Sequence, residues 1–125
     1  VVAEHADWWN YIYRTPEEYA HKQEVLKQHC RDVGRDYDEI LQVVAPQILI
    51  AETEDELRRL QESGTARSVA SNGIAGTPEQ VTEALQTAIR MGARRVTVSF
   101  ADSPRTDGTL LFSERVLPQL VDFRP

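Results

Sequence analysis

The side chains of this chain that could do chemistry are few, and they match no standard catalytic arrangement. The three histidines, at positions 5, 21 and 29, have no metal-ligand spacing with Cys30, because neighbouring positions on a predicted helix point in different directions. No nucleophile–base pair, Walker loop or GxGxxG motif is present. Five acidic residues fall in the first turns of predicted helices, where they complement the helix dipole rather than form a catalytic pair: Glu17, Glu18, Glu54, Asp55 and Glu56. We therefore predict no metal site and assign no catalytic residue.

The remaining candidates for binding are polar and aromatic side chains near predicted strand ends. Trp9 could stack on a ligand and Asn10 could hydrogen bond to one, but a tryptophan there could equally pack between sheet and helices, and Asn10 could turn the chain. Thr97 and Ser99 alternate with valines and share one side of the last predicted strand, as a ligand site or an ordinary barrel layer would require. Arg105, on the polar loop that follows, could meet an anionic substrate or remain solvated.

The elements that position these residues repeat one unit, a strand followed by a capped helix. Thr15, Thr53 and Thr77 each begin a capping box, and the first and third have proline at the first helical position. Strand-like segments lie at about 6–10, 47–51 and 94–100, and Pro46 is expected at a break between two strand pieces. This alternation predicts an α/β fold with a parallel sheet. Three strands cannot close a barrel and would leave unpaired edges.

Three further segments carry local expectations. Residues 64–76 are rich in Ser, Ala and Gly and are predicted to form a loop. The last helix is predicted over about 110–121, with Pro118 kinking or shortening it. The helix that begins at Thr15 should bury Cys30 as a core thiol and end at Gly34.

Composition bounds the class of protein. The 125 residues amount to a single domain or less, and 41% are apolar, which is enough for a real core. A net charge of -6 without a basic run argues against nucleic acid or an anionic membrane as a partner. No stretch approaches the roughly 18 apolar residues of a membrane span. The one cysteine excludes an internal disulfide and suits the reducing cytoplasm. Because the chain starts at Val1 and its only methionine is Met91, we expect the true N-terminus to lie elsewhere.

Six segments occur in an order that resembles luciferase-like flavin-dependent oxidoreductases, the family of bacterial luciferase, and in particular the branch that uses the deazaflavin coenzyme F-420. They are Ala6-Asp-Trp-Trp-Asn10, Thr15-Pro-Glu-Glu18, Gly34-Arg-Asp36, Ile50-Ala-Glu-Thr53, Gly76-Thr-Pro-Glu-Gln-Val81 and the stretch from Phe112 to Leu120. The resemblance implies a TIM (β/α)8 barrel and places this chain as its C-terminal part, from the end of the fifth helix through strands six, seven and eight. A whole barrel takes about 250 residues, so the chain would be roughly half of one.

The resemblance also implies a function. The intact protein would pass a hydride or electrons between FMN or F-420 and a small organic substrate, with Trp9, Asn10 and Ser99 as candidate cofactor contacts and Arg105 as a candidate substrate contact. The family's glycine-rich phosphate loop would lie upstream of Val1, so the chain is expected to show no turnover by itself and could bind no cofactor alone. An alternative is a non-catalytic half-barrel that covers its open edges by pairing with a second copy or with the missing N-terminal half.

Overall fold

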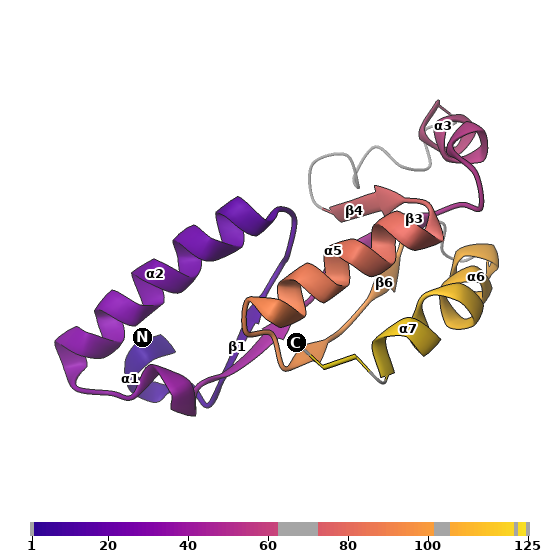
Figure 1. The fold of residues 1–125 in the computed structure, drawn as a ribbon. Helices are drawn as coiled ribbons and strands as arrows, with labels where there is room; N and C mark the ends of the chain where they lie inside the picture. The colour runs from indigo at the N-terminus through magenta and orange to yellow at the C-terminus, as the bar shows by residue number, and fades with distance from the viewer. Residues whose placement is uncertain (1, 63–72, 102–105, 122, 125) are drawn as a thin grey trace.

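The computed structural model describes residues 2–62, 73–101, 106–121 and 123–124, which form parallel strands with flanking helices (Figure 1). The strands are β1 (Trp8–Tyr11), β2 (Leu41–Val44), β3 (Gln47–Ile50), β4 (Gly73–Gly76), β5 (Arg95–Val96) and β6 (Ser99–Phe100). The helices are α1 (Val2–His5), α2 (Pro16–Val33), the 3-10 turn η1 (Tyr37–Glu39), α3 (Glu54–Glu62), α5 (Pro78–Arg90), α6 (Asp107–Arg115) and α7 (Leu117–Val121). The α/β class and the parallel sheet are those predicted.

β2 and β3 follow each other in the chain and together form the central strand of the sheet, and β5 and β6 together form the strand beside it. β2 pairs with β1 on one side and β5 on the other, and β3 pairs with β4 and β6, all in parallel. The central strand breaks at Pro46, as predicted, because proline has no N–H for the ladder. Its carbonyl still accepts from the Ser99 N–H at 3.3 Å, so the two strands stay paired across the break. β5 and β6 lie on one side of the central strand formed by β2 and β3. β1 and β4 therefore both lie on its other side.

The prediction of three strands was too low, because residues 73–76 form β4 instead of a loop. The strand runs in register with β3, from Gln47 opposite Gly73 to Ile50 opposite Gly76. Its sequence is poor in strand-forming residues, and Ile74 is its one buried hydrophobic side chain. β1 pairs with β2 and not with β3, so this edge of β3 is free, and main-chain groups of β4 pair with it. The rest of the predicted loop, 64–72, lies outside the described residues.

The helix boundaries follow the capping chemistry in the sequence. The Thr77 hydroxyl accepts from the Gln80 N–H at 3.5 Å, and the Gln80 side chain accepts from the Thr77 N–H at 2.9 Å, which completes the capping box. Gly34 ends α2 at φ 75°, a left-handed conformation that favours glycine. The last helix begins earlier than predicted and is divided into α6 and α7, with Pro118 in the first turn of α7.

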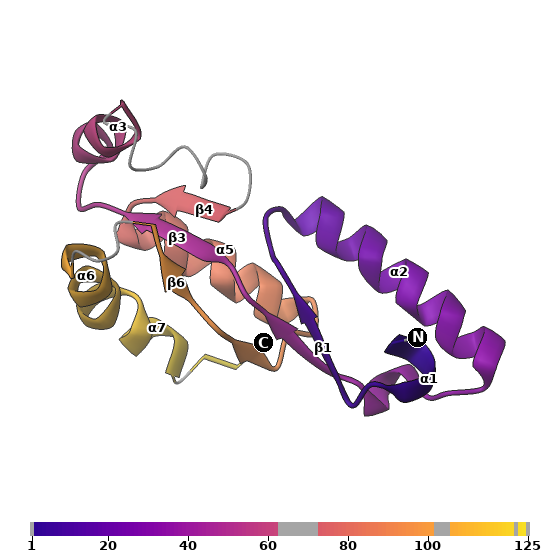
Figure 2. The same ribbon diagram turned by 180° about the vertical axis from the view of Figure 1, so that it is seen from behind.

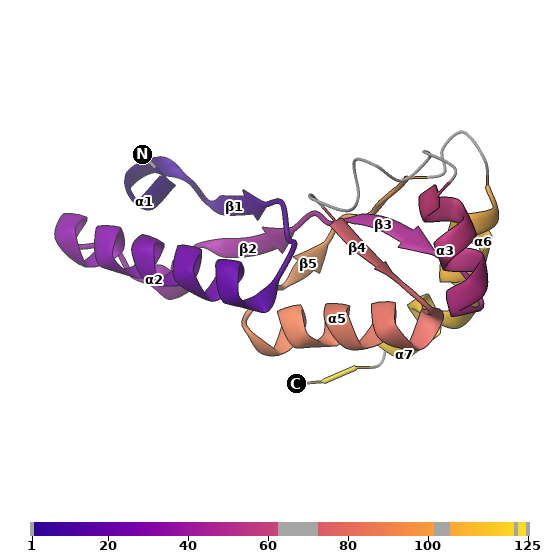
Figure 3. The ribbon, with the colours of Figure 1, turned by 90° about the horizontal axis from the view of Figure 1, so that it is seen from above.

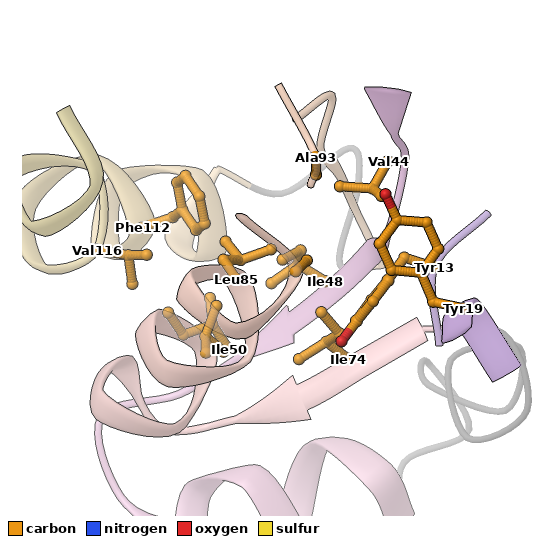
Figure 4. Close-up of a cluster of buried hydrophobic side chains, with 12 residues drawn as sticks. Tyr13, Tyr19, Val44, Ile48, Ile50, Ile74, Leu85, Ala93, Phe112 and Val116 are labelled. Atoms are coloured by element: carbon orange, nitrogen blue, oxygen red, sulfur yellow. The ribbon is translucent and has the colours of Figure 1, made fainter. Parts of the chain in front are cut away.

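The helices α2 and α5 lie on one face of the sheet and leave most of the other face uncovered (Figures 2 and 3). The main core fills the space beneath these helices (Figure 4). Its buried members are Tyr13, Tyr19, Val44, Ile48, Ile50, Ile74, Val81, Leu85, Ala88, Ala93, Phe112 and Val116. A smaller cluster under α2 holds Leu26, Ile40 and the predicted core thiol of Cys30, which is 1% exposed. Val33, at the end of α2, is exposed.

A buried polar network ties α2, β2 and the end of α5 together. The Gln42 side-chain oxygen, Oε1, accepts from the Tyr19 hydroxyl and from the Gln23 side-chain amide at 2.9 Å. The Gln42 amide donates to the Tyr37 hydroxyl at 2.8 Å, and the Gln23 amide also donates to the Met91 carbonyl at 2.7 Å. Both glutamines are 7% exposed, so these bonds take the place of the hydrogen bonds to water that their side chains lose on burial.

Candidate functional site

The uncovered face of the sheet carries the polar side chains of the strands. Residues paired in a parallel ladder share a face, so Asn10, Val43 and Arg95 lie together, and Gln47 lies with Ser99. Asn10, Arg95, Thr97 and Ser99 are exposed there, whereas Val96 and Val98 pack against the core under the helices. We name the residues Trp8, Asn10, Arg95, Thr97 and Ser99 the open face. In a parallel barrel this side of the sheet faces the axis.

At one end of the open face an aromatic ring and a guanidinium group span the sheet. The Arg95 guanidinium lies 4.5 Å from the Trp8 ring centroid, within range of a cation–π interaction. Trp8 is on β1 and Arg95 on β5, so the pair reaches across β2, whose Val43 lies opposite Arg95 in the ladder and is only 5% exposed. Neither Trp8 nor Arg95 was a predicted site residue. Their pairing depends on strand order, which no local pattern in the sequence records.

The predicted site residues do not all fall on this face. Asn10 and Ser99 do, and both are exposed. Trp9 points the other way and packs with Tyr11 and Tyr19, at ring-centroid distances of 5.4 and 5.9 Å, between the sheet and α2. Arg105 lies outside the described residues. The binding roles of these four residues stay predictions.

A cleft of about 630 Å³ opens at the C-terminal end of β3, between α3 and α6. Its apolar lining comes from Ile50, Leu60, Leu110 and Leu111. Its charged lining comes from Glu52, Glu56, Arg59, Asp107 and Glu114. The C-terminal ends of parallel strands are where TIM barrels bind ligands. Sequence reasoning missed this cleft, because its two walls are separated by more than 40 residues of chain.

The groups whose protonation the fold shifts are tyrosines. Burial raises the pKa of the Tyr13 hydroxyl to about 12, and it raises the pKa values of Tyr11, Tyr19 and Tyr37 as well. These hydroxyls therefore stay protonated at neutral pH and act as hydrogen-bond donors or acceptors, not as general bases. Within the described part of the chain, no group of three or more His, Cys, Asp or Glu side chains could hold a metal ion.

The chain was compared with known proteins. No protein-family model matches it, and no curated protein matches it. Among solved structures it resembles a riboflavin lyase determined with modified FMN and substrate riboflavin, at a TM-score of 0.72 and 17% identity over 96% of this chain and 39% of that one. It also resembles a long-chain alkane monooxygenase, at a TM-score of 0.70 and 15% identity over 96% of this chain and 37% of that one.

A third similar structure is the coenzyme F-420 dependent tetrahydromethanopterin reductase from Methanopyrus kandleri. Its TM-score is 0.65 at 15% identity, and the match covers 94% of this chain and 46% of that one. At these identities the matches show the fold alone, and they agree with the predicted α/β partial barrel, since each covers only part of the solved structure. The chain spans less than half the length of each of these structures.

Proposed function

We propose that this chain is the C-terminal segment of a luciferase-like oxidoreductase that uses FMN or F-420 to transform a small organic molecule. The observation that carries the proposal is the match of 96% of this chain to 39% of a structure that holds a modified FMN. This coverage of 39% is close to three of the eight strands of a barrel. Each of the two parts of the sheet has three strands. The remaining five strands would then come from a segment that precedes Val1.

The open face suits the ring system of such a cofactor better than its phosphate. Asn10, Thr97 and Ser99 offer exposed amide and hydroxyl groups for hydrogen bonds to a flavin or deazaflavin ring. The charged groups at the C-terminal end of β3 are mostly acidic and would repel a phosphate. We therefore place the phosphate site outside this chain. When bound, the cofactor supplies the redox chemistry, and these residues orient it.

The partners and compartment belong to the same proposal. Lacking the phosphate site, the chain alone would show no turnover. Its natural ligand would be a small molecule, and its net charge of -6 disfavours nucleic acid. No helix in the described ranges is both long and apolar enough to cross a membrane. We place the protein in the cytoplasm, where the single thiol of Cys30 would stay reduced.

An alternative function is favoured by the uncovered side of the sheet. A half-barrel that exposes one face and two edges could serve as an assembly module, which pairs with a second copy of itself instead of binding a cofactor. Trp8, 55% exposed on β1, and Ile12, 64% exposed just after the end of β1, would be buried by such pairing.

Titration with FMN and with riboflavin separates the two functions. Trp8 lies on the open face and Trp9 on the opposite face, so quenching of the Trp8 fluorescence reports a ring bound at the open face. We expect both ligands to quench it with the same affinity, because the chain has no phosphate site. N10A and S99A should weaken this binding, and S113A, on the exposed surface of α6, should not.

Two other outcomes of this titration would contradict the proposal. Absence of quenching by either ligand would remove the support for a retained cofactor face and favour the assembly module. A strong preference for FMN over riboflavin would contradict the placement of the phosphate site outside this chain.

A further inference from the structure

We propose that the cleft between α3 and α6 binds an organic cation with an apolar body, such as an alkylammonium ion. The cleft is built entirely from this chain, so its ligand would bind without a redox cofactor and without other barrel strands. Its volume of about 630 Å³ is within the range of small-molecule sites. The proposal therefore does not rest on the oxidoreductase function proposed above.

The apolar part of the ligand is indicated by the floor and walls of the cleft. Ile50, at the end of β3, is 4% exposed and forms part of the floor. Leu60 of α3 and Leu111 of α6 are half-buried on the two walls, and Leu110 is 58% exposed beside them. Covering Leu110 with an apolar ligand would remove it from water, which gives binding a hydrophobic contribution.

The charge of the ligand is indicated by the four acidic side chains that line the cleft, against which the described residues of the lining offer a single basic one, Arg59. Glu52 lies 3.9 Å from the Arg115 guanidinium, so its charge is partly balanced from outside the cleft. Glu56 on α3 and Glu114 on α6 have no ion-pair or hydrogen-bond partner for their carboxylates within the described residues. A cation between the two walls would balance both.

An anion fits the cleft less well. The start of α6 offers free N–H groups, but its first residue is Asp107, and the acidic excess would repel a second negative charge. Glu114 lies in the last turn of α6, where the negative end of the helix dipole also favours a cation. We therefore place the ammonium group near Glu56 and Glu114 and the alkyl chain along Ile50 and the leucines.

The test is a titration of the ¹⁵N-labelled chain with n-octylammonium, n-octanol and n-octanoate, followed by NMR. We expect n-octylammonium to shift the amide signals of Ala51, Gly108 and Leu111 saturably, with n-octanol weaker and n-octanoate not bound. Shortening the alkyl chain from eight to six carbons should weaken binding by roughly tenfold, because two buried methylenes are lost.

Matched variants test the charge requirement. The double substitution E56Q and E114Q should weaken n-octylammonium binding by about tenfold. The control pair E17Q and E83Q makes the same change in net charge outside the cleft and should leave binding unchanged. All four glutamates are exposed, so the variants should fold, and their amide spectra show directly whether they do.

Three results would overturn the proposal. They are the absence of saturable shifts at the cleft amides, equal binding of n-octanoate and n-octylammonium, or wild-type affinity in the E56Q/E114Q variant. None of them bears on flavin binding at the open face, which is read from tryptophan fluorescence instead.

Discussion

Two buried tyrosines of the main core differ in one respect, the partner of the hydroxyl group. The Tyr19 hydroxyl donates to Gln42, whereas the Tyr13 hydroxyl has no partner among the described residues although the side chain is 1% exposed. An unpaired buried hydroxyl costs free energy, and a paired one contributes about 0.5–1.5 kcal/mol. The same substitution, tyrosine to phenylalanine, should therefore have opposite effects at the two positions.

We expect Y19F to lower the free energy of unfolding by about 1 kcal/mol and Y13F to leave it unchanged or raise it by up to about 1 kcal/mol. Urea unfolding at neutral pH measures both, and each variant serves as the control for the other. An equal loss in the two variants would show that the Tyr13 hydroxyl has a partner in solution.

The raised pKa of Tyr13 makes stability depend on alkaline pH. The folded-state pKa is about 12 and the ordinary pKa of a tyrosine hydroxyl is 10.0, so the folded chain holds this proton more tightly than the unfolded chain does. The resulting stabilisation is fully present below pH 10 and is lost as pH rises from 10 toward 12. Urea unfolding at steps between about pH 9 and pH 11 should show a falling free energy of unfolding, with a shallower fall in Y13F.

Some slope should remain in Y13F, because burial raises the pKa values of Tyr19 and Tyr37 in the same direction. An identical alkaline profile in wild type and Y13F would mean that this hydroxyl is not buried. No comparable change is expected from Tyr13 between pH 6 and pH 8, since it stays protonated there.

At the scale of the elements, two helix starts provide a matched comparison. The Thr77 hydroxyl caps α5, whereas Thr106 at the start of α6 makes no side-chain capping bond. T77A should lower the free energy of unfolding by about 1 kcal/mol, and T106A should change it by less than about 0.5 kcal/mol. Urea unfolding checks both. Equal effects would indicate that the Thr77 hydroxyl does not cap the helix in solution.

The same local chemistry explains how much of the fold could be predicted. Cap residues, Gly34 and Pro46 act on their immediate neighbours, so the sequence alone located the starts of α2 and α5, the end of α2 and the break between β2 and β3. β4 could not be found in this way. Its Gly73-Ile-Ala-Gly76 segment has no strand pattern, and it pairs because β3 offers a free edge there.

The buried network shows a second limit of local patterns. Gln23 interrupts the apolar stripe of α2, and Gln42 interrupts the apolar run of β2 and β3, so each was visible as a polar residue in an apolar pattern. That the two bond to each other depends on where α2 crosses the sheet.

The candidate site was also predictable only in part. The alternation of Thr97 and Ser99 with valines indicated the open face from the sequence. The Trp8–Arg95 pair and the cleft could be found only from the tertiary structure.

At the scale of the whole molecule, the sheet has free edges, and β1 forms part of one of them. The carbonyls of Asp7 and Tyr11 accept from the N–H groups of Leu41 and Ala45, so alternate main-chain groups of β1 face β2. By the same alternation the Asn10 N–H faces away from β2, toward the open edge. A second copy, or the barrel strands that the proposed preceding segment would supply, could pair with this edge.

We expect the isolated chain to associate with itself through this edge, and proline at position 10 to weaken that association. N10P removes the outward N–H but keeps the bonds to β2, whereas N10A keeps the N–H and removes only the side chain. Light scattering across a concentration series should show a rise in mass for wild type and N10A and a smaller rise for N10P. Because each copy carries a net charge of -6, added salt should strengthen the association. If all three proteins are monomers, or if N10P associates as N10A does, the β1 edge is not the contact; circular dichroism confirms that N10P has folded.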